Sequence, residues 1–355
     1  MSIRLAEIAG GKGEWLRAAG PEADIAISTR VRLARNLANF PFHNRLSPEQ
    51  AQALVDFVEN KIRRALNNQN LILQRLSDLD QTDRQILLER HIISREMAES
   101  TKPCAVAFDR EETIGIMIAE EDHLRIQAMR SGLDIGKAWE RVNALDDLLE
   151  SEMDFAFSSK YGYLTACPTN AGTGMRASIM LHLPGLVMTK HIEKVYNTVS
   201  QMNLAVRGLY GEGTQAHGDF FQVSNQITLG KDEQTTVREV DAVARTVVEY
   251  ERRSRRWLRE KGAPKLLDKI SRDLGILKNA FIITSQEALG LLSSIRLGVN
   301  LGLIKGLEIE TVNELFLASQ PAHIQARHGG ELSTEERNAI RANTLRAALQ
   351  PASIG

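Results

Sequence analysis

The chain has 355 residues, 43% of them hydrophobic, and its 44 Lys and Arg against 45 Asp and Glu give a formal net charge of −1. Such a length predicts a large core and two domains, and the even charge balance argues against a dedicated nucleic-acid-binding protein. Two cysteines give no disulfide framework, and neither a signal peptide nor an apolar run near the roughly 20 residues of a membrane span is found, so a cytoplasmic protein without membrane contact is expected.

The first two thirds of the chain alternate helix-like and strand-like segments. The clearest helix covers 47–66, where Ser47 is a good N-cap, Pro48 suits the first turn and Gln50 completes a capping box. The other segments are predicted, in chain order, as a helix over 80–92, a hairpin of strands 104–108 and 114–119, a helix over 132–157, a strand over 177–183, a helix over 184–203, and strands over 204–210 and 220–229. Strands joined by hairpins and interleaved with helices predict an α+β fold with an antiparallel sheet flanked by helices.

The pattern changes after about residue 231, where strand signals fade and helical periodicity takes over. Thr284 and Ser333 each precede a glutamate by three residues, which is typical of helix N-termini. We therefore predict two domains, a catalytic domain over 1–256 and an all-helical C-terminal domain over 257–355.

Arginines recur on the predicted strands and beside the glycine-rich loops. Arg30 and Arg32 alternate in STRVRLARN and so share one strand face, and Arg125, Arg176 and Arg207 occupy comparable places. On its own, STRVRLARN is more typical of a strand with a solvated basic face. Together, five arginines without a lysine favour bidentate recognition of phosphate. ATP with Mg²⁺ would need such a cradle, because the chain has no Gly-Lys-Ser/Thr phosphate loop.

Two glutamates are left without a role in phosphate binding. Glu121 lies in EEDHLRI, where an extended chain would put it on the same face as His123 and Arg125, and Glu212 lies between two glycines in RGLYGEG. Alone, these stretches would be an exposed hairpin end and a surface loop. Beside an arginine cradle, the two carboxylates predict a site for a cationic acceptor.

Four motifs in this order, STRVRLARN, EEDHLRI, CPTNAGTGMRAS and RGLYGEG, resemble the phosphagen (guanidino) kinases over about residues 24–255. In the animal members a helical domain precedes this catalytic core and closes over a small substrate. Here the first motif begins at Ser28, and a helical domain follows the core instead. That arrangement resembles the McsB-type protein-arginine kinases of bacteria, which implies an acceptor arginine attached to a polypeptide.

The resemblance also implies roles for individual residues. Glu121 and Glu212 match the carboxylates that grip the acceptor guanidinium, and Cys167 matches the reactive-site cysteine, although a small buried filler is the alternative for it. Glu120, Asp122 and His123 would support them. The implied ATP site comprises Ser28, Thr29, Arg30, Val31, Arg32, His91, Arg125, Arg176, Ala177, Ser178, Ile179, Met180, Arg207, Gly208, Leu209, Tyr210, Gly211 and Glu212. No protein-held metal is predicted.

The stretch RNAIRA in the C-terminal domain resembles an Arg-Asp-x-x-Arg-Ala motif that is implied to bind phosphoarginine and regulate the enzyme. Arg337 and Arg341 are spaced to share one helical face, and Ala342 completes the motif, but Asn338 stands where the pattern has Asp. Losing that carboxylate removes a partner for the guanidinium part of a phosphoarginine. A basic solvated helix face is the alternative.

The function predicted is ATP-dependent phosphorylation of protein arginines, which by resemblance marks proteins for degradation and inactivates a heat-shock repressor. The implied partners are substrate proteins with exposed arginines, an activator protein, that repressor, a Clp-type unfoldase and a second copy of the chain. The alternatives are a small-molecule guanidino kinase, or a non-catalytic adaptor that binds phosphoarginine.

Overall fold

The computed structural model describes residues 9–208, 217–329 and 331–355. Within them, the central feature is an eight-stranded sheet in the order β2-β3-β4-β5-β1-β8-β10-β9, and each pair of neighbours is antiparallel. Its strands are β1 (Ala26–Arg35), β2 (Ile72–Arg75), β3 (Ala105–Phe108), β4 (Ile114–Ile118), β5 (Leu124–Ser131), β8 (Met175–His182), β9 (Leu204–Gly208) and β10 (Phe220–Asn225). A small separate hairpin is formed by β6 (Phe157–Ser158) and β7 (Gly162–Tyr163).

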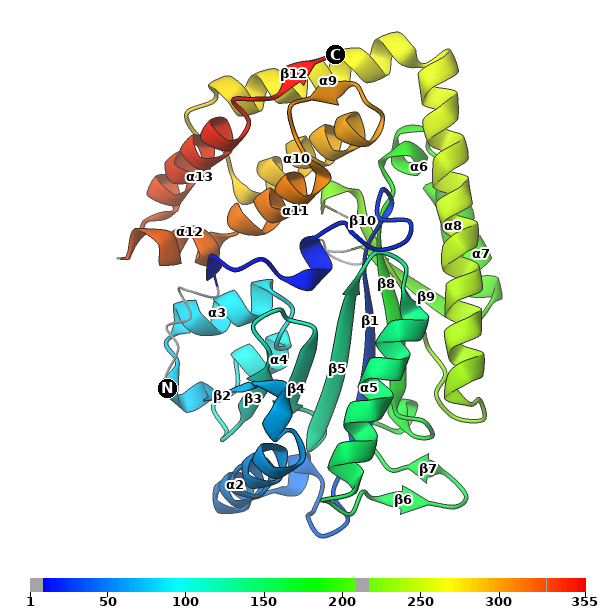
Figure 1. The fold of residues 1–355 in the computed structure, drawn as a ribbon, viewed down its shortest axis with the longest axis vertical. Helices are drawn as coiled ribbons and strands as arrows, with labels where there is room; N and C mark the ends of the chain where they lie inside the picture. The colour runs from blue at the N-terminus through cyan, green and yellow to red at the C-terminus, as the bar shows by residue number, and fades with distance from the viewer. Residues whose placement is uncertain (1–8, 209–216, 330) are drawn as a thin grey trace.

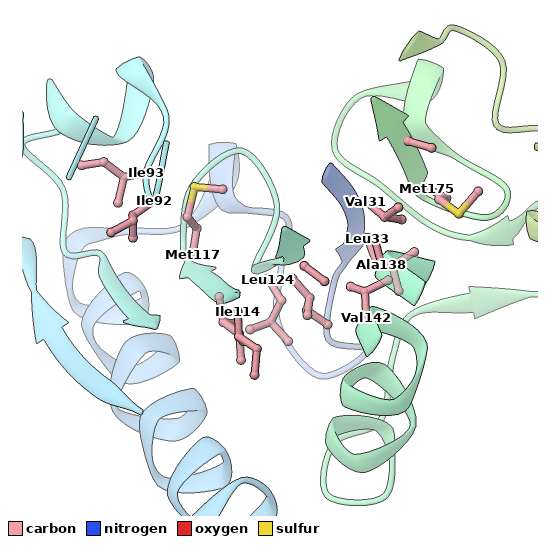
Figure 2. Packing of buried hydrophobic residues seen from close by; sticks show 14 of the residues in the cluster. Val31, Leu33, Ile92, Ile93, Ile114, Met117, Leu124, Ala138, Val142 and Met175 are labelled. Atoms are coloured by element: carbon pink, nitrogen blue, oxygen red, sulfur yellow. The ribbon is translucent and has the colours of Figure 1, made fainter. Parts of the chain in front are cut away.

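Helices cover one face of the sheet (Figure 1). Val31 and Leu33 of β1 lie near Ala138 and Val142 of α5 in the main hydrophobic core, as Figure 2 shows. The helices of this region are α2 (Pro48–Ala65), α3 (Gln81–Glu89), α4 (Arg95–Ala98), α5 (Ile135–Glu150), α6 (Pro184–Met188), α7 (Ile192–Gln201) and α8 (Glu233–Lys261). The predicted α+β fold with an antiparallel sheet and flanking helices is confirmed.

Several predicted elements are confirmed and others change at their ends. The capping box of Ser47 is formed, and the 104–108 and 114–119 strands pair as a hairpin. The helix predicted over 132–157 is shorter and covers Ile135–Glu150. The residues before it, Leu124–Ser131, form β5, a strand that was not predicted. The helix predicted over 184–203 is broken in two, with Lys190 in the left-handed conformation between the parts.

The C-terminal helices pack against one end of the sheet (Figure 1). They are α9 (Ala263–Asn279), α10 (Ser285–Asn300), α11 (Ile309–Ala318), α12 (Pro321–His328) and α13 (Thr334–Ala348), with a two-residue strand pair of β11 (Ile304–Lys305) and β12 (Ser353–Ile354). Their core includes Trp15 from the short helix η1 (Glu14–Leu16), Ile27 of β1 and Phe220 of β10. The helical region therefore buries side chains of the sheet region as part of its own core.

Arg296 of α10 ties the helical region to the sheet region from within. Its guanidinium is fully buried and donates to the carbonyls of Ala23 and Asp24 at 2.7 and 2.9 Å, and its Nε donates to Asn313 at 2.9 Å. The boundary proposed at 256/257 falls inside the continuous helix α8, so the two proposed domains share an element. Among the described residues, no helix is long and apolar enough to cross a membrane.

Candidate active site

A cleft of about 900 Å³ opens on the face of the sheet opposite the α5 core. Five arginines from four strands of the sheet line it, and Glu121 and Cys167 also belong to its lining. The lining arginines are Arg30 and Arg32 of β1, Arg125 of β5, Arg176 of β8 and Arg207 of β9. The structure thus brings together five predicted arginines that lie far apart in the sequence.

Strand alternation and register put these arginines side by side. Arg30 and Arg32 point to the cleft because Val31 and Leu33 point to the core. Arg32 is paired directly with Arg176 across the β1–β8 ladder. Like charges directly opposite each other destabilise a sheet, so this arrangement favours a function that needs concentrated positive charge.

We refer to Arg30, Arg32, Arg125, Arg176 and Arg207 together as the arginine cradle. The concentration of positive charge in this cradle favours the binding of an anion. Burial, reinforced by Arg125 and Arg176, lowers the pKa of Arg30 to about 10. Burial also lowers the pKa of Arg32 and of Arg176, with neighbouring arginines adding to the effect. The Nε atoms of Arg32 and Arg176 are buried and have no hydrogen-bond partner among the described residues. Phosphate oxygens would relieve both the repulsion and the unmet hydrogen bonds.

Glu121 lies at the tip of the β4–β5 hairpin rather than in a strand. Residues 120–123 form a tight turn, and β5 begins only at Leu124, so Glu121 and His123 do not share a strand face as an extended chain would require. Arg125 reaches back over the turn and pairs with Glu120 and with Glu121, both at 2.8 Å. The Glu121 side chain is 45% exposed, so it remains accessible from the cleft.

A buried network holds this turn in shape. Asp122 accepts hydrogen bonds from the Asn36 side chain at 2.6 Å and from the Ala166 amide at 2.7 Å. His123 accepts from the Leu37 amide at 3.0 Å through Nδ1, and its Nε2 lies 2.8 Å from the Pro41 carbonyl, which requires the neutral ring. Burial lowers the pKa of His123 to about 4, in agreement with that geometry. Asp122 and His123 thus hold the turn that carries Glu121, and their supporting roles in the reaction stay a prediction.

The loop before β8 carries Cys167 and leads into the strand on which Arg176 lies. Gly174 has a φ of 63°, and a Cβ there would lie 2.6 Å from the Ala34 carbonyl, so only glycine fits. Arg35 clamps this loop by donating to the Thr173 carbonyl at 2.9 Å while it pairs with Asp146 at 2.6 Å. The Cys167 thiol is partly exposed in the cleft wall, 3.0 Å from the Thr169 hydroxyl.

A smaller cavity of about 100 Å³ adjoins the cradle at Arg30. It is lined by Ser28, Arg30, His91, Met129, Ser178, Met180 and Gln222. His91 has a φ of 59°, and its ring lies 5.3 Å from that of Trp15. Burial, with Arg30 and Arg32 nearby, lowers the pKa of His91 to about 3. The cavity thus combines a neutral histidine with two methionines and two serine hydroxyls, and Arg30 connects it to the larger cleft.

Some residues predicted for the ATP site do not face either cavity. Thr29, Val31, Ala177 and Ile179 are fully buried on the other face of their strands, so any contact with a nucleotide would involve their backbone only. Thr29 instead donates to the Gly132 carbonyl at 2.7 Å. Gly208 lines the cleft, and the remaining predicted residues, Leu209, Tyr210, Gly211 and Glu212, lie outside the described residues.

Other lining residues were not anticipated from the sequence. Gln222 of β10 faces both cavities, and His43 together with the segment 94–102 around α4 forms the wall opposite the cysteine loop. Gln222 could have been found as the one polar residue among the apolar residues at the start of its strand. The α4 wall carries no comparable signal.

The predicted phosphoarginine residues lie on α13. Arg341 is buried, and it donates to the Ser319 carbonyl at 2.6 Å, the Ile283 carbonyl at 2.9 Å and the Asn338 side chain at 2.6 Å. Arg337 donates to the Leu332 carbonyl at 2.6 Å. Burial, with Arg337 nearby, lowers the pKa of Arg341 to about 10. Ala342 is fully buried in the helical core.

Two family models match this chain, one over the sheet region and one over the C-terminal helices. Residues 54–254 match the family model described as ATP:guanido phosphotransferase, C-terminal catalytic domain, and residues 263–354 match the one described as protein-arginine kinase McsB C-terminal domain. A protein named protein-arginine kinase from Symbiobacterium thermophilum is 45% identical over 95% of this chain and 97% of its own length. One of the same name from Desulforamulus reducens is 45% identical over 96% of both chains.

Solved structures agree with the fold. A duplicated taurocyamine kinase from Schistosoma mansoni with bound transition-state-analogue components superposes with a TM-score of 0.60 at 27% identity over 66% of this chain. The match spans only 34% of that duplicated structure. A lombricine kinase superposes with a TM-score of 0.57 at 22% identity, over 65% of this chain and 67% of its own, which supports the fold alone.

Proposed function

The chain belongs to the ATP:guanido phosphotransferase family and, within it, to the protein-arginine kinases, and we propose that Glu121 and Glu212 grip the acceptor while the arginine cradle holds ATP. The reaction is transfer of the γ-phosphoryl group of ATP to an arginine side chain of a protein, which yields phosphoarginine and ADP. The observation that carries the residue assignment is the position of Glu121 in the wall of the arginine-lined cleft.

The acceptor poses the main chemical difficulty. An arginine side chain has a pKa of about 12.5–13.8, so its nitrogens carry a shared positive charge at neutral pH and are poor nucleophiles. Removing the proton beforehand would cost on the order of 8 kcal/mol. A pair of carboxylates instead holds the planar cation through charge-assisted hydrogen bonds and orients one nitrogen toward the γ-phosphorus.

In the proposed step, the nitrogen–phosphorus bond forms as the bond from phosphorus to the ADP oxygen breaks. Glu121 accepts the proton released by the attacking nitrogen, and Glu212 orients the guanidinium and shares its charge. Carboxylates are weak bases, so their contribution lies in positioning and in accepting the proton late in the reaction. Glu121 must leave its ion pair with Arg125 to do so, which phosphate binding by Arg125 would favour.

The arginine cradle provides the phosphate contacts. Arg30, Arg32 and Arg176 are placed by strand register, so they need no rearrangement to meet an anion. Mg²⁺ is proposed to accompany ATP, where it neutralises charge on the phosphate oxygens. The part of the chain that the structure describes holds no group of three or more His, Cys, Asp or Glu side chains that could bind a metal.

Family membership also supports proposals about the cellular role, the partners and the regulation of this protein. The proposed roles are marking of proteins for degradation and inactivation of a heat-shock repressor. The proposed partners are an activator protein, a Clp-type unfoldase and a second copy of the chain, and the proposed regulatory site binds phosphoarginine around Arg337 and Arg341. On the same basis, catalysis is proposed for residues 1–256, and regulation and dimerisation are proposed for residues 257–355.

The function is tested by incubating the protein with ATP, Mg²⁺ and a loosely folded protein, followed by mass spectrometry for acid-labile phosphoarginine. The wild-type protein is expected to form phosphoarginine on the test protein, and the Glu121→Gln variant is not. Phosphorylation of free arginine alone would indicate a small-molecule kinase. Binding of phosphoarginine without any transfer would indicate an adaptor.

A further inference from the structure

A second large hollow lies on the catalytic region, between the α6–α7 segment and the second half of α8. Its volume is about 870 Å³, close to that of the active-site cleft, and none of its lining residues also lines that cleft. Cavities of this size accommodate a drug-sized molecule or a few side chains. We call it the α7–α8 hollow. Nothing in the proposed reaction uses it.

The charge of the α7–α8 hollow has one sign. His191, Lys194 and Arg253 contribute to its lining, and no carboxylate does. The side chains of Lys194 and Arg253 are exposed and form neither an ion pair nor a hydrogen bond with any residue in the described ranges. By contrast, Arg252 and Arg255 on the same helix are paired, with Glu22 and Glu251 respectively.

The same hollow presents an apolar surface. Trp257 is 54% exposed at its wall, Tyr250 is half-buried, and Leu186 in the lining is only 2% exposed. An indole exposed beside cations that have no side-chain partner in the described part of the chain is typical of interaction sites, where aromatic and arginine side chains contribute most of the binding energy. Asn197 and Gln201 offer amides that can bond a peptide backbone.

We propose that the α7–α8 hollow docks an acidic segment of a partner protein, with carboxylates against Lys194 and Arg253 and an apolar side chain against Trp257. Charge complementarity selects an anionic partner, and the apolar wall selects one that carries hydrophobic side chains. A nucleic-acid backbone fits less well, because it requires an extended basic tract, and the chain has a net charge of −1.

Docking in the α7–α8 hollow would hold a partner protein close to the active-site cleft. The α7 helix packs on β9, and β9 carries Arg207 of the active-site cleft. A protein held in the α7–α8 hollow would therefore be anchored one element away from the phosphate cradle. Docking itself does not depend on the proposed catalysis and can be measured without ATP.

The test uses the full chain and a synthetic peptide that alternates glutamate and leucine. The chain has three tryptophans, of which Trp15 is buried and Trp139 half-buried, so peptide binding should change the emission of Trp257. The change should saturate, weaken as salt is raised, and disappear in Trp257→Phe. Lys194→Glu with Arg253→Glu should weaken binding roughly tenfold or more.

A charge-matched control carries Lys137→Glu and Arg272→Glu, whose side chains are 64% and 74% exposed on other helices. It should bind the peptide like wild type. The proposal is overturned if the peptide does not bind saturably, if both double variants bind it equally, or if single-stranded DNA or inorganic phosphate displaces it at comparable concentration.

Discussion

The Nδ1 atom of His323 lies 2.7 Å from a carboxylate oxygen of Glu89, in a contact buried between α12 and α3. The same carboxylate accepts from the amides of Ala322 and His323 at 3.0 and 3.3 Å, so Glu89 caps α12 from another part of the chain. The next residue, Arg90, approaches His323 at 3.4 Å and pairs with the buried Glu112. The helical region therefore contacts the segment that carries His91 into the small cavity.

Glu89→Ala is expected to lower the free energy of unfolding by about 2–4 kcal/mol, because it removes a cap and leaves buried donors without a partner. It should also weaken ATP binding, since Arg90 and His91 lose their support. Thermal unfolding and nucleotide titration measure the two effects. Ser47→Ala removes the exposed cap of α2 and should cost about 1 kcal/mol while leaving ATP affinity unchanged. Equal ATP affinity in both variants would contradict the inference that Glu89 supports the position of His91.

Glu121→Gln and Glu212→Gln should each lower the rate of phosphoarginine formation by about 10²–10⁴-fold, the range for a lost general base or its partner. ATP affinity should change little, because the proposed step uses both carboxylates to hold the acceptor guanidinium, although the resemblance also puts Glu212 among the residues of the ATP site. Single-turnover kinetics with a protein substrate measures the rate. Glu150→Gln, at an exposed glutamate of α5, is the control with normal turnover. A normal rate in either site variant would refute its assigned role.

Arg30→Met should have opposite effects on stability and on function. The lowered pKa of Arg30, about 10, means that the folded protein disfavours its charge, so removal should raise the unfolding free energy of the ligand-free protein by about 1 kcal/mol. ATP binding should weaken roughly tenfold or more through the loss of charge-assisted hydrogen bonds. Urea unfolding and nucleotide titration on the same sample provide both values. A variant that is less stable and binds ATP normally would contradict the assignment of Arg30 to phosphate binding.

Local sequence patterns predicted much of this structure. The capping box of Ser47, the hairpin strands and the alternation of Arg30 and Arg32 follow from rules that act over a few residues. Register does not follow from such rules, and it is register that places Arg176 opposite Arg32. The turn at Glu121 was also missed, because its shape depends on Asn36, distant in the sequence.

Long-range packing accounts for the remaining differences. The cap of α12 by Glu89, and the sheet side chains buried in the helical core, depend on contacts between segments far apart in the sequence. The wall around α4 enters the cleft for the same reason. The four motifs that indicated the family carried site information that periodicity alone did not contain.

The free energy of unfolding should fall as the pH is lowered from about 6.5 toward 4. Buried His123 has a pKa of about 4 in the folded protein against 6.5 in an ordinary environment, so in this range the unfolded chain binds the proton and the folded chain does not. The slope should be at most about 1.4 kcal/mol per pH unit for this residue. Urea unfolding at several pH values measures it, and His123→Asn should reduce the slope. His191→Asn, at an exposed histidine, should leave it unchanged; equal slopes in both variants would count against the neutral ring.

Asn338→Asp is expected to tighten binding of free phosphoarginine about fivefold. The Asn338 oxygen already lies 2.6 Å from Arg341, and a carboxylate there would make a charge-assisted bond either to that residue or to the guanidinium part of the ligand, worth about 1 kcal/mol more than an amide. Calorimetric titration of the ligand against both proteins measures the change. Because burial and Arg337 lower the pKa of Arg341, the added negative charge should also raise the melting temperature of the free protein. If the variant melts higher and binds no more tightly, Asn338 serves α13 alone and the ligand site lies elsewhere.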